Sequence, residues 1–208
     1  MKILVTGARG FIGQWVCKSL NKRGVEWAAF KGDILRGEDF APHEDCDTVI
    51  HLAAKVRAAG ALEHMIQVNV EGTLNVLRFV SARRRRIIFA SSYLYGAPRE
   101  QPLKENHPTT YDNAYSFSKW LAEQAIIGQS LHLGIRGVVV RIFNAYGPGQ
   151  KTGFLIPDIF EGARRGRLML RSVSPRRDFI FVEDLAELIV SAAVAAVGGL
   201  EIVNAGSG

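Results

Sequence analysis

An apolar run at residues 2–5 leads directly into a turn with three glycines at a spacing of three, and this segment most constrains the fold. The run is typical of a buried parallel strand, and apolar residues at helical spacing over 11–23 predict an amphipathic helix. Strand, glycine turn and helix form the context that a dinucleotide-binding loop requires. Gly7 would allow a tight turn, Gly10 would let backbone approach a diphosphate at the helix N-terminus, and Gly13 would let the helix pack closely on the sheet. The alternative is an ordinary strand–turn–helix with incidental glycines.

The rest of the chain repeats this alternation of strand and helix. Strand-like runs lie at 25–30, 48–52, 87–91 and 137–142, and helix-like stretches lie at 61–82 and 113–133. The alternation predicts an α/β fold with a parallel sheet covered by helices on both faces, and right-handed crossovers make it a doubly wound, Rossmann-type sheet. Ligands of such sheets bind at the carboxyl ends of the strands. We therefore expect Gly7, Ser91 and Asn144, which follow predicted strands, to meet at one edge.

Tyr115 and Lys119 are separated by one helical turn in the predicted helix 113–133. Positions i and i+4 share a helix face, so the ammonium group would lie close to the phenol. A nearby positive charge favours the phenolate, and a tyrosine with a lowered pKa can act as acid and base toward an alcohol or ketone. Many helices carry this pair by chance, so the pair indicates a catalytic site only in combination with the glycine turn.

Composition indicates an ordinary globular protein with one large core, because 48% of the residues are apolar and 22% are charged. No apolar run approaches the ~20 residues of a membrane span, and the chain starts in its first strand without a visible signal peptide. Cys17 and Cys46 are too few for a disulfide framework, which favours the cytoplasm. Neither the cysteines nor the histidines have metal-ligand spacing, so no metal site is expected.

The net charge of +6 makes partners with phosphate groups plausible, and the densest basic block is Arg83-Arg84-Arg85-Arg86. The block stands between a predicted helix and a predicted strand, where a solvated surface turn is the favoured interpretation. The alternative is a patch for anionic macromolecules. Nucleic acid is disfavoured as a partner, because no interleaved aromatic residues, helix-turn-helix or zinc pattern accompany the block.

Several further segments, taken in order, resemble those of one known family. They are the glycine turn at 7–13, Asp47–Ala54, Asn69–Thr73, Ile87–Gly96, Tyr115–Lys119, Arg141–Pro148, Arg177–Asp184 and Val203–Gly208. Together they resemble the extended short-chain dehydrogenase/reductases, the NAD-dependent epimerases and dehydratases that act mostly on nucleotide sugars. The resemblance, which extends over essentially the whole chain, implies an enzyme with a nucleotide-sugar substrate and a homodimer formed by helices 61–82 and 113–133.

The resemblance also implies site residues. It makes Ser91, Tyr115 and Lys119 catalytic, with Ser91 favoured over Ser92 as the hydroxyl that holds the substrate oxygen. Cofactor contacts are assigned to Gly7, Arg9, Gly10, Phe11, Ile12, Gly13, Lys31, Asp33, Ile34, Leu52, Ala53, Ala54, Asn69, Tyr115 and Lys119. Substrate contacts are assigned to Ser92, Tyr93, Asn144 and Arg177. Tyr93 has core packing as its alternative, and Arg177 has a structural ion pair with Asp178 or Asp184.

The implied reaction is reversible hydride transfer between NAD(P) and a sugar hydroxyl or ketone, most specifically 4-epimerisation. An NADPH-dependent 4-ketoreductase is the alternative among enzymes, and a non-catalytic dinucleotide- or RNA-binding module of the same fold is the alternative outside them. Sugar 4,6-dehydration is disfavoured because the family uses an Asp-Glu pair after the catalytic hydroxyl, where this chain has Ser92-Tyr93.

The chain departs from the family in two places. It stops at Gly208, so residues 1–148 and 177–208 are expected to form the NAD(P)-binding domain, with 149–176 as a partial substrate-binding segment. At the end of the second strand Lys31 stands where the family often has an acid. A lysine there favours a 2′-phosphate and, with Arg9, tilts the preference toward NADP. Asp33 follows in a connection that seems shortened, and it is an alternative partner for the ribose.

Overall fold

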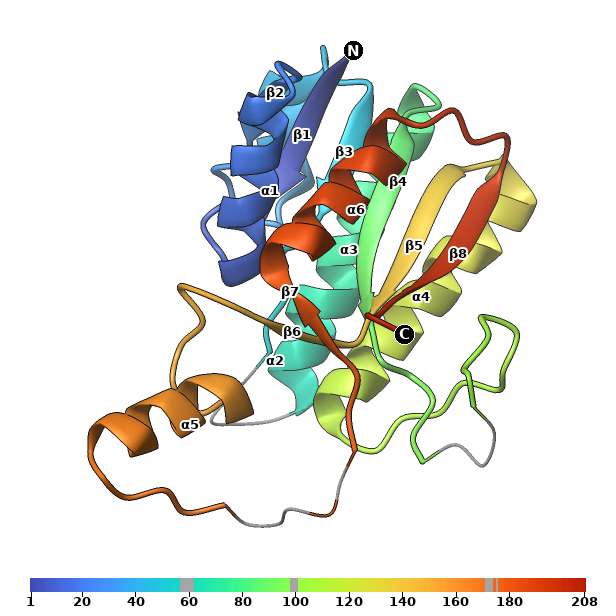
Figure 1. Cartoon of the computed structure of the whole chain (residues 1–208). Coiled ribbons are helices and arrows are strands. Elements are labelled where there is room, and N and C mark those ends of the chain that lie inside the picture. Colours follow the sequence, from blue (N-terminus) through green and yellow to red (C-terminus); the bar gives the residue numbers. More distant parts are fainter. Residues whose placement is uncertain (57–61, 98–100, 171–173, 175) are drawn as a thin grey trace.

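The computed structural model describes residues 1–56, 62–97, 101–170, 174 and 176–208, and its centre is a six-stranded parallel sheet (Figure 1). The strands are β1 (Lys2–Thr6), β2 (Glu26–Ala29), β3 (Thr48–His51), β4 (Arg86–Ser92), β5 (Arg136–Ile142) and β8 (Leu200–Ala205). Their order in the sheet is β2-β1-β3-β4-β5-β8. The doubly wound α/β fold and the five strands expected from the sequence are confirmed, each within two residues at either end. The sixth strand, β8, was expected only through the family resemblance.

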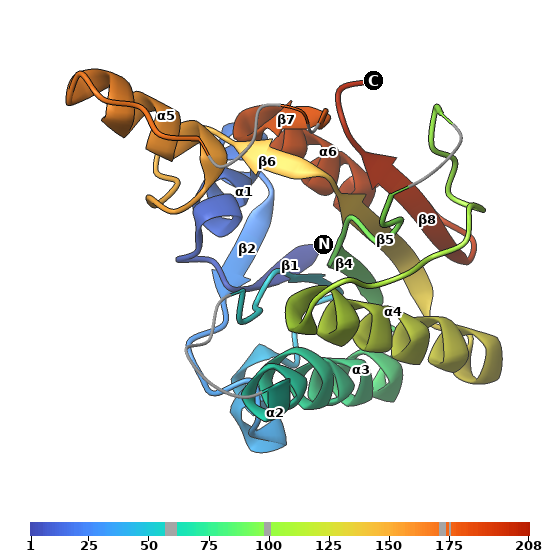
Figure 2. The ribbon, with the colours of Figure 1, turned by 90° about the horizontal axis from the view of Figure 1, so that it is seen from below.

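Helices cover both faces of the sheet (Figure 2). One face carries α1 (Phe11–Lys22) and α6 (Val182–Val194), which pack against each other. The other face carries α2 (Leu62–Ile66), the π-helical turn η2 (Gln67–Glu71), α3 (Gly72–Ala82) and α4 (Ala114–Leu133). The helix expected over 61–82 is therefore interrupted by a π-helical turn, and residue 61 lies outside the described residues. Within the described part, no helix is long and apolar enough to cross a bilayer.

The alternation of side chains along the strands divides the core in two. Ile3 and Val5 pack on the face of α1 and α6, whereas Leu4 packs on the face of α3 and α4, and all three are fully buried. Successive residues of a strand point to opposite faces, so a strand buried on both faces must be apolar throughout. Full burial of one such side chain stabilises the fold by roughly 1.5–3 kcal/mol.

Between β2 and β3 the chain makes only a loop and the 3₁₀ helix η1 (Gly37–His43). Phe30 leaves β2 and stacks on Phe40 of this helix, with ring centroids 4.4 Å apart. This stack joins the short connection to the core on the face of α3 and α4. The short connection agrees with the expected loss of elements after the second strand.

Residues 143–181 leave the sheet and return to it. They contain β6 (Asn144–Tyr146) and β7 (Phe179–Phe181), which form a two-stranded parallel ribbon, and α5 (Leu155–Arg164). Helix α5 projects from the body of the molecule, and none of its residues is buried (Figure 1). The expected division into a cofactor domain and a partial substrate segment over 149–176 stays a prediction; residues 171–173 and 175 of that segment lie outside the described residues.

Candidate active site

The glycine turn after β1 lies at the carboxyl end of the sheet and has room for backbone alone. Gly7 has a φ of +71°, and a Cβ there would stand 2.7 Å from the backbone nitrogen of Ala53. A Cβ on Gly13 would stand 2.1 Å from the carbonyl oxygen of Gly7. Gly13 therefore packs against the turn, whereas we had expected it to pack against the sheet. Gly10 begins α1 without a side-chain cap. A diphosphate group fits this arrangement, because uncapped N–H groups at a helix N-terminus bind anions.

The loop after β3 forms the next wall of this edge. Thr6 holds it, since its carbonyl accepts from the backbone N–H of Leu52 and its hydroxyl accepts from that of Ala53, both at 3.2 Å. The Asn69 side chain bonds the backbone of Lys55 at 2.6 and 3.0 Å and donates to the Ser118 hydroxyl at 2.8 Å; its expected contact with the cofactor stays a prediction. With its amide occupied by the protein, Asn69 positions this loop.

At the expected adenosine end, Lys31 and Arg9 are exposed, whereas Asp33 is tied into a turn. Asp33 Oδ1 accepts from the backbone N–H of Leu35 at 3.0 Å. The Ile34 side chain is buried against the Cα of Gly72, where an added Cβ would meet it at 2.8 Å. The Ile34 side chain is therefore part of the core, and its expected contact with the cofactor stays a prediction.

Helix α4 begins with a capping box and turns one polar face toward the carboxyl edge of the sheet. Asn113 Oδ1 accepts from the backbone N–H of Ser116 at 2.9 Å, and the Ser116 hydroxyl accepts from that of Asn113 at 3.1 Å. Such a box fixes the first turn of a helix. The expected pair Tyr115 and Lys119 follows this cap directly, as the sequence predicted.

The two adjacent serines at the end of β4 have different partners. Ser91 is 3% exposed, and its hydroxyl donates to Glu123 Oε2 at 2.5 Å. The Ser92 side chain lies near Tyr115 and lowers the pKa of its phenol. Both serines therefore contact α4, Ser91 at Glu123 and Ser92 at Tyr115. This arrangement favours Ser92 as the hydroxyl beside the tyrosine, and the assignment of the catalytic serine stays a prediction.

Burial controls the protonation of both Tyr115 and Lys119. It raises the pKa of Tyr115 to about 12, with the Ser92 side chain acting in the opposite direction. Burial also lowers the pKa of Lys119 to about 7, although the negative charge of Glu123 acts to raise it. Lys119 Nζ lies over the Phe89 ring, 3.9 Å from its centroid. The causes of the Tyr115 pKa are burial and Ser92, and Lys119 is not among them; the expected lowering of this pKa by Lys119 stays a prediction.

Glu123 is a residue that the sequence analysis missed. It is fully buried and accepts from Arg141 Nη2 at 2.6 Å and Nε at 3.0 Å, in addition to Ser91. Arg141 Nη1 donates to the Tyr95 hydroxyl at 2.8 Å, which donates to Asn204 Oδ1 at 2.6 Å. A signal existed, because Glu123 lies one turn beyond Lys119 on the same helix face. The network joins α4, β4, β5 and β8 beneath the site.

The expected substrate residues gather at the start of the ribbon β6–β7. The Asn144 amide donates to the backbone carbonyl of Asp178 at 2.8 Å. Burial raises the pKa of Tyr93, and the positive charge of Arg177 acts in the opposite direction. Arg177 is exposed and makes no ion pair with Asp178 or Asp184 in the described part of the chain; Asp178 accepts from the backbone and hydroxyl of Ser207 instead.

The comparisons with known proteins point to one family. The model of the NAD dependent epimerase/dehydratase family matches residues 3–206. A putative UDP-glucose 4-epimerase of Methanocaldococcus jannaschii is 31% identical, over 99% of this chain and 77% of the relative. A GDP-6-deoxy-D-mannose reductase of Pseudomonas aeruginosa is 32% identical, over 88% of this chain and 67% of the relative. The structure of RMD from Pseudomonas aeruginosa with NADPH superposes with a TM-score of 0.85 at 29% identity, over 100% of this chain and 78% of that one.

Proposed function

Because the chain belongs to the NAD-dependent epimerase/dehydratase family, we propose that it is a nucleotide-sugar 4-epimerase. The observation that carries this proposal is the position of Tyr115 and Lys119 in the first turns of α4, directly after the capping box at Asn113, with Ser91 and Ser92 at the end of β4. The Ser92 side chain lies close enough to Tyr115 to lower the pKa of its phenol, so both hydroxyl groups can serve one oxygen atom of a sugar. Similarity to a putative UDP-glucose 4-epimerase supports the substrate class.

In the proposed mechanism Ser92 orients the substrate oxygen and Tyr115 moves its proton. A dinucleotide bound over the glycine turn supplies the hydride acceptor. Lys119 lies one turn from Tyr115 and compensates the charge of the phenolate when protonated, and Asn69 keeps the loop at Lys55 in place. Ser91 holds Glu123 and takes no part in proton transfer. Asn144 and Arg177 are proposed to contact the diphosphate of the substrate, since a guanidinium suits phosphate oxygens.

A 4-ketoreductase that consumes NADPH is the second candidate, and two observations favour it. Tyr115 with a pKa of about 12 is protonated at neutral pH, which suits donation of a proton to a ketone. Lys31 and Arg9 are exposed cations near the adenosine end, which suits a 2′-phosphate. We therefore propose NADP as the preferred cofactor. Dehydration is disfavoured whether Ser91 or Ser92 is the catalytic serine. Neither serine is followed by a residue with a carboxyl group, because the next residues are Tyr93 and Leu94.

We also propose a homodimer in which α3 and α4 of two copies pack together. Leu131 and Leu133 at the end of α4 are 82% and 60% exposed, which suits an apolar contact with a second copy. Cys17 and Cys46 are free thiols, which supports a reducing compartment such as the cytoplasm. Light scattering coupled to size exclusion tests the dimer, and a mass of one chain contradicts it.

The experiment that separates the two enzymatic candidates follows the cofactor. The purified protein is incubated with UDP-glucose and UDP-galactose, and the cofactor released by denaturation is quantified. An epimerase retains its cofactor and interconverts the two sugars without net oxidation. Consumption of added NADPH in proportion to a 4-keto sugar establishes the reductase instead. If neither nucleotide binds at any concentration, the enzymatic proposal is wrong.

A further inference from the structure

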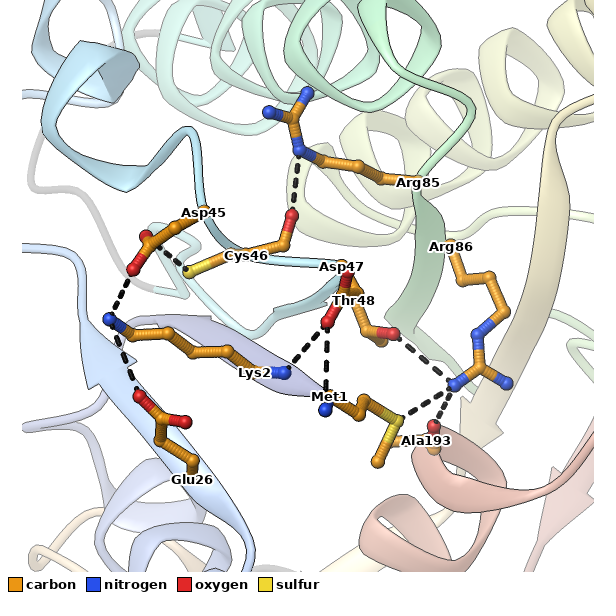
Figure 3. Close-up of polar contacts among 10 residues, drawn as sticks. All are labelled: Met1, Lys2, Glu26, Asp45, Cys46, Asp47, Thr48, Arg85, Arg86 and Ala193. Carbon is orange, nitrogen blue, oxygen red and sulfur yellow. Dashed lines mark hydrogen bonds and ion pairs between the residues drawn. The ribbon is translucent and has the colours of Figure 1, made fainter.

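A pocket of about 510 Å³ opens at the amino ends of the strands, on the edge opposite to the candidate active site. Figure 3 shows much of its surroundings, where β1, β3 and β4 begin. Its lining residues are Glu44, Asp45, Cys46, Asp47, Arg83, Arg84, Arg85, Arg86 and Arg136. Five arginines and three acids therefore share one hollow. Its size falls in the range of roughly 300–1,000 Å³ that is usual for small-molecule sites.

The three acids of this pocket already have partners. Glu44 Oε2 accepts from both Arg83 and Arg85, at 2.8 and 2.7 Å. Asp45 pairs with Lys2 Nζ at 2.6 Å, as Figure 3 shows.

Asp47, the third acid, accepts from the backbone N–H of Lys2 at 2.9 Å. None of the three pairs with Arg84, Arg86 or Arg136. The pocket therefore carries excess positive charge that its own carboxylates do not neutralise.

Two of the five arginines serve the fold. The Arg85 side chain is 2% exposed and donates to the carbonyls of Cys46 and Phe79 at 2.8 and 2.7 Å. Arg86 donates to the carbonyl of Ala193 at 2.6 Å and to that of Ala195, at the end of α6. The Arg83–Arg86 block is therefore only in part the solvated turn that the sequence predicted.

Arg84 and Arg136 are the arginines of the pocket that are available to bind a ligand. Both are exposed, and within the described residues no hydrogen bond or ion pair of either side chain is found. Arg84 has a φ of +50°, the left-handed conformation that ends a helix and strongly favours glycine. The backbone N–H of Arg85 bonds the carbonyl of Val80 at 2.9 Å, as this type of helix end requires. An arginine therefore stands at a position where glycine would be more stable, and its guanidinium lines the pocket.

We propose that this pocket binds a small anion of the diphosphate class, with Arg84 and Arg136 as its main donors and Arg83 and Arg86 contributing charge. Guanidinium groups pair with phosphate oxygens through two parallel hydrogen bonds, and several of them around one hollow suit a multiply charged ligand. The lining residues include no aromatic ring on which a base could stack, which disfavours nucleic acid. The site is separate from the diphosphate sites of cofactor and substrate, which belong to the other edge of the sheet.

The test is calorimetric titration of the full chain with inorganic pyrophosphate, on the wild type and on Arg84→Gly, Arg136→Gln and the double variant. Loss of one charge-assisted contact is expected to weaken binding roughly tenfold. Arg84→Gly has the advantage that glycine relieves the left-handed conformation, so its Tm is expected to rise by about 2 °C while affinity falls. A variant that is more stable but binds pyrophosphate more weakly would show that Arg84 serves the ligand and not the fold.

Lys22→Gln is the matched control, because Lys22 is an exposed cation at the end of α1 outside the pocket lining. It is expected to leave pyrophosphate affinity within about twofold of the wild type, since exposed charges at a distance are screened by salt. Equal affinities for the wild type and the double variant would assign the anion to the glycine turn or the substrate site and overturn the proposal. Failure of the wild type to bind pyrophosphate, or an equal loss in Lys22→Gln, would overturn it as well.

Discussion

Helices α4 and α5 differ in how they are attached to the rest of the molecule. In α4 the charged residues Lys119 and Glu123 are buried, and a polar network beneath them links four elements of the core. In α5 no residue is buried, and Glu161 pairs with Arg164 and Arg165 only on the helix surface. The geometry of the proposed catalytic site is therefore fixed by the core, whereas the segment proposed to bind the sugar contributes little to stability. Substitutions in α4 should therefore lower both stability and catalytic activity. Substitutions in α5 should have little effect on the stability of the substrate-free protein.

The largest effect is expected when the buried carboxylate of α4 is removed. Glu123→Ala leaves the Arg141 guanidinium buried without its partner, which should lower the free energy of unfolding by about 3–5 kcal/mol. The matched change in α5, Glu161→Ala, should cost at most about 1 kcal/mol because exposed ion pairs are weak. Urea denaturation measures both. Similar losses in the two variants would remove the contrast between the helices.

A pH titration sharpens the same contrast. The folded pKa of Lys119 is about 7, below its ordinary value of 10.5, so between these two values the unfolded chain binds more protons. Stability should therefore rise with pH in this window, with a slope from this group of at most ~1.4 kcal/mol per pH unit. The rise should be smaller in Lys119→Met. Unfolding free energies at pH 7 to 9, below the range in which Tyr115 titrates, decide this; parallel curves for the two proteins would contradict it.

A smaller effect is expected at the adenosine end. Lys31→Asp replaces an exposed cation by an acceptor for ribose hydroxyls and should shift the ratio of NADP to NAD affinity roughly tenfold toward NAD, about 1.4 kcal/mol. Fluorescence titration with both reduced cofactors measures the ratio. Arg9→Gln should move it in the same direction. An unchanged ratio in both variants would show that neither cation reads the 2′-phosphate.

The smallest effect is expected on α5. Phe160 is 74% exposed, so Phe160→Gln should change the free energy of unfolding by no more than about 0.5 kcal/mol. A loss of several kcal/mol would mean that Phe160 is covered in solution, for example by a second copy of the chain. Denaturation at two protein concentrations distinguishes these cases, because only an intermolecular contact depends on concentration.

The sequence predicted the parts of the molecule that follow local rules. The glycine turn, five strands and the Tyr115–Lys119 pair depend on spacing and periodicity, and all lie where expected. The choice between Ser91 and Ser92 could not be made from the sequence, because both serines contact α4 and only the fold shows which residue each one meets. The missed role of Glu123 had the same origin. A charged residue in a helix normally faces water, and only its packing against Arg141 reveals that it is buried.

Local patterns also failed where distant residues provide the partner. Arg85 belongs to a block of four arginines that resembles a solvated turn, yet it is enclosed by Glu44, Cys46 and Phe79. Asn69 matched a cofactor contact in sequence, while its amide is used by Lys55 and Ser118. In each case a residue type was recognised correctly, and its partner could be known only from the fold.

The central claim is that Ser92 and Tyr115 form the proton-transfer pair while Ser91 is structural. The direct measurement is kcat for Ser92→Ala and Ser91→Ala, with Tyr115→Phe as the reference for a lost acid–base group. We predict that kcat falls by about 10²–10⁴ in Tyr115→Phe and by at least about tenfold in Ser92→Ala. In Ser91→Ala kcat should stay near wild type, while unfolding free energy drops by about 1–3 kcal/mol because Glu123 loses a donor. A Ser91→Ala enzyme that folds stably and turns over as slowly as Tyr115→Phe, beside an active Ser92→Ala enzyme, would contradict the account.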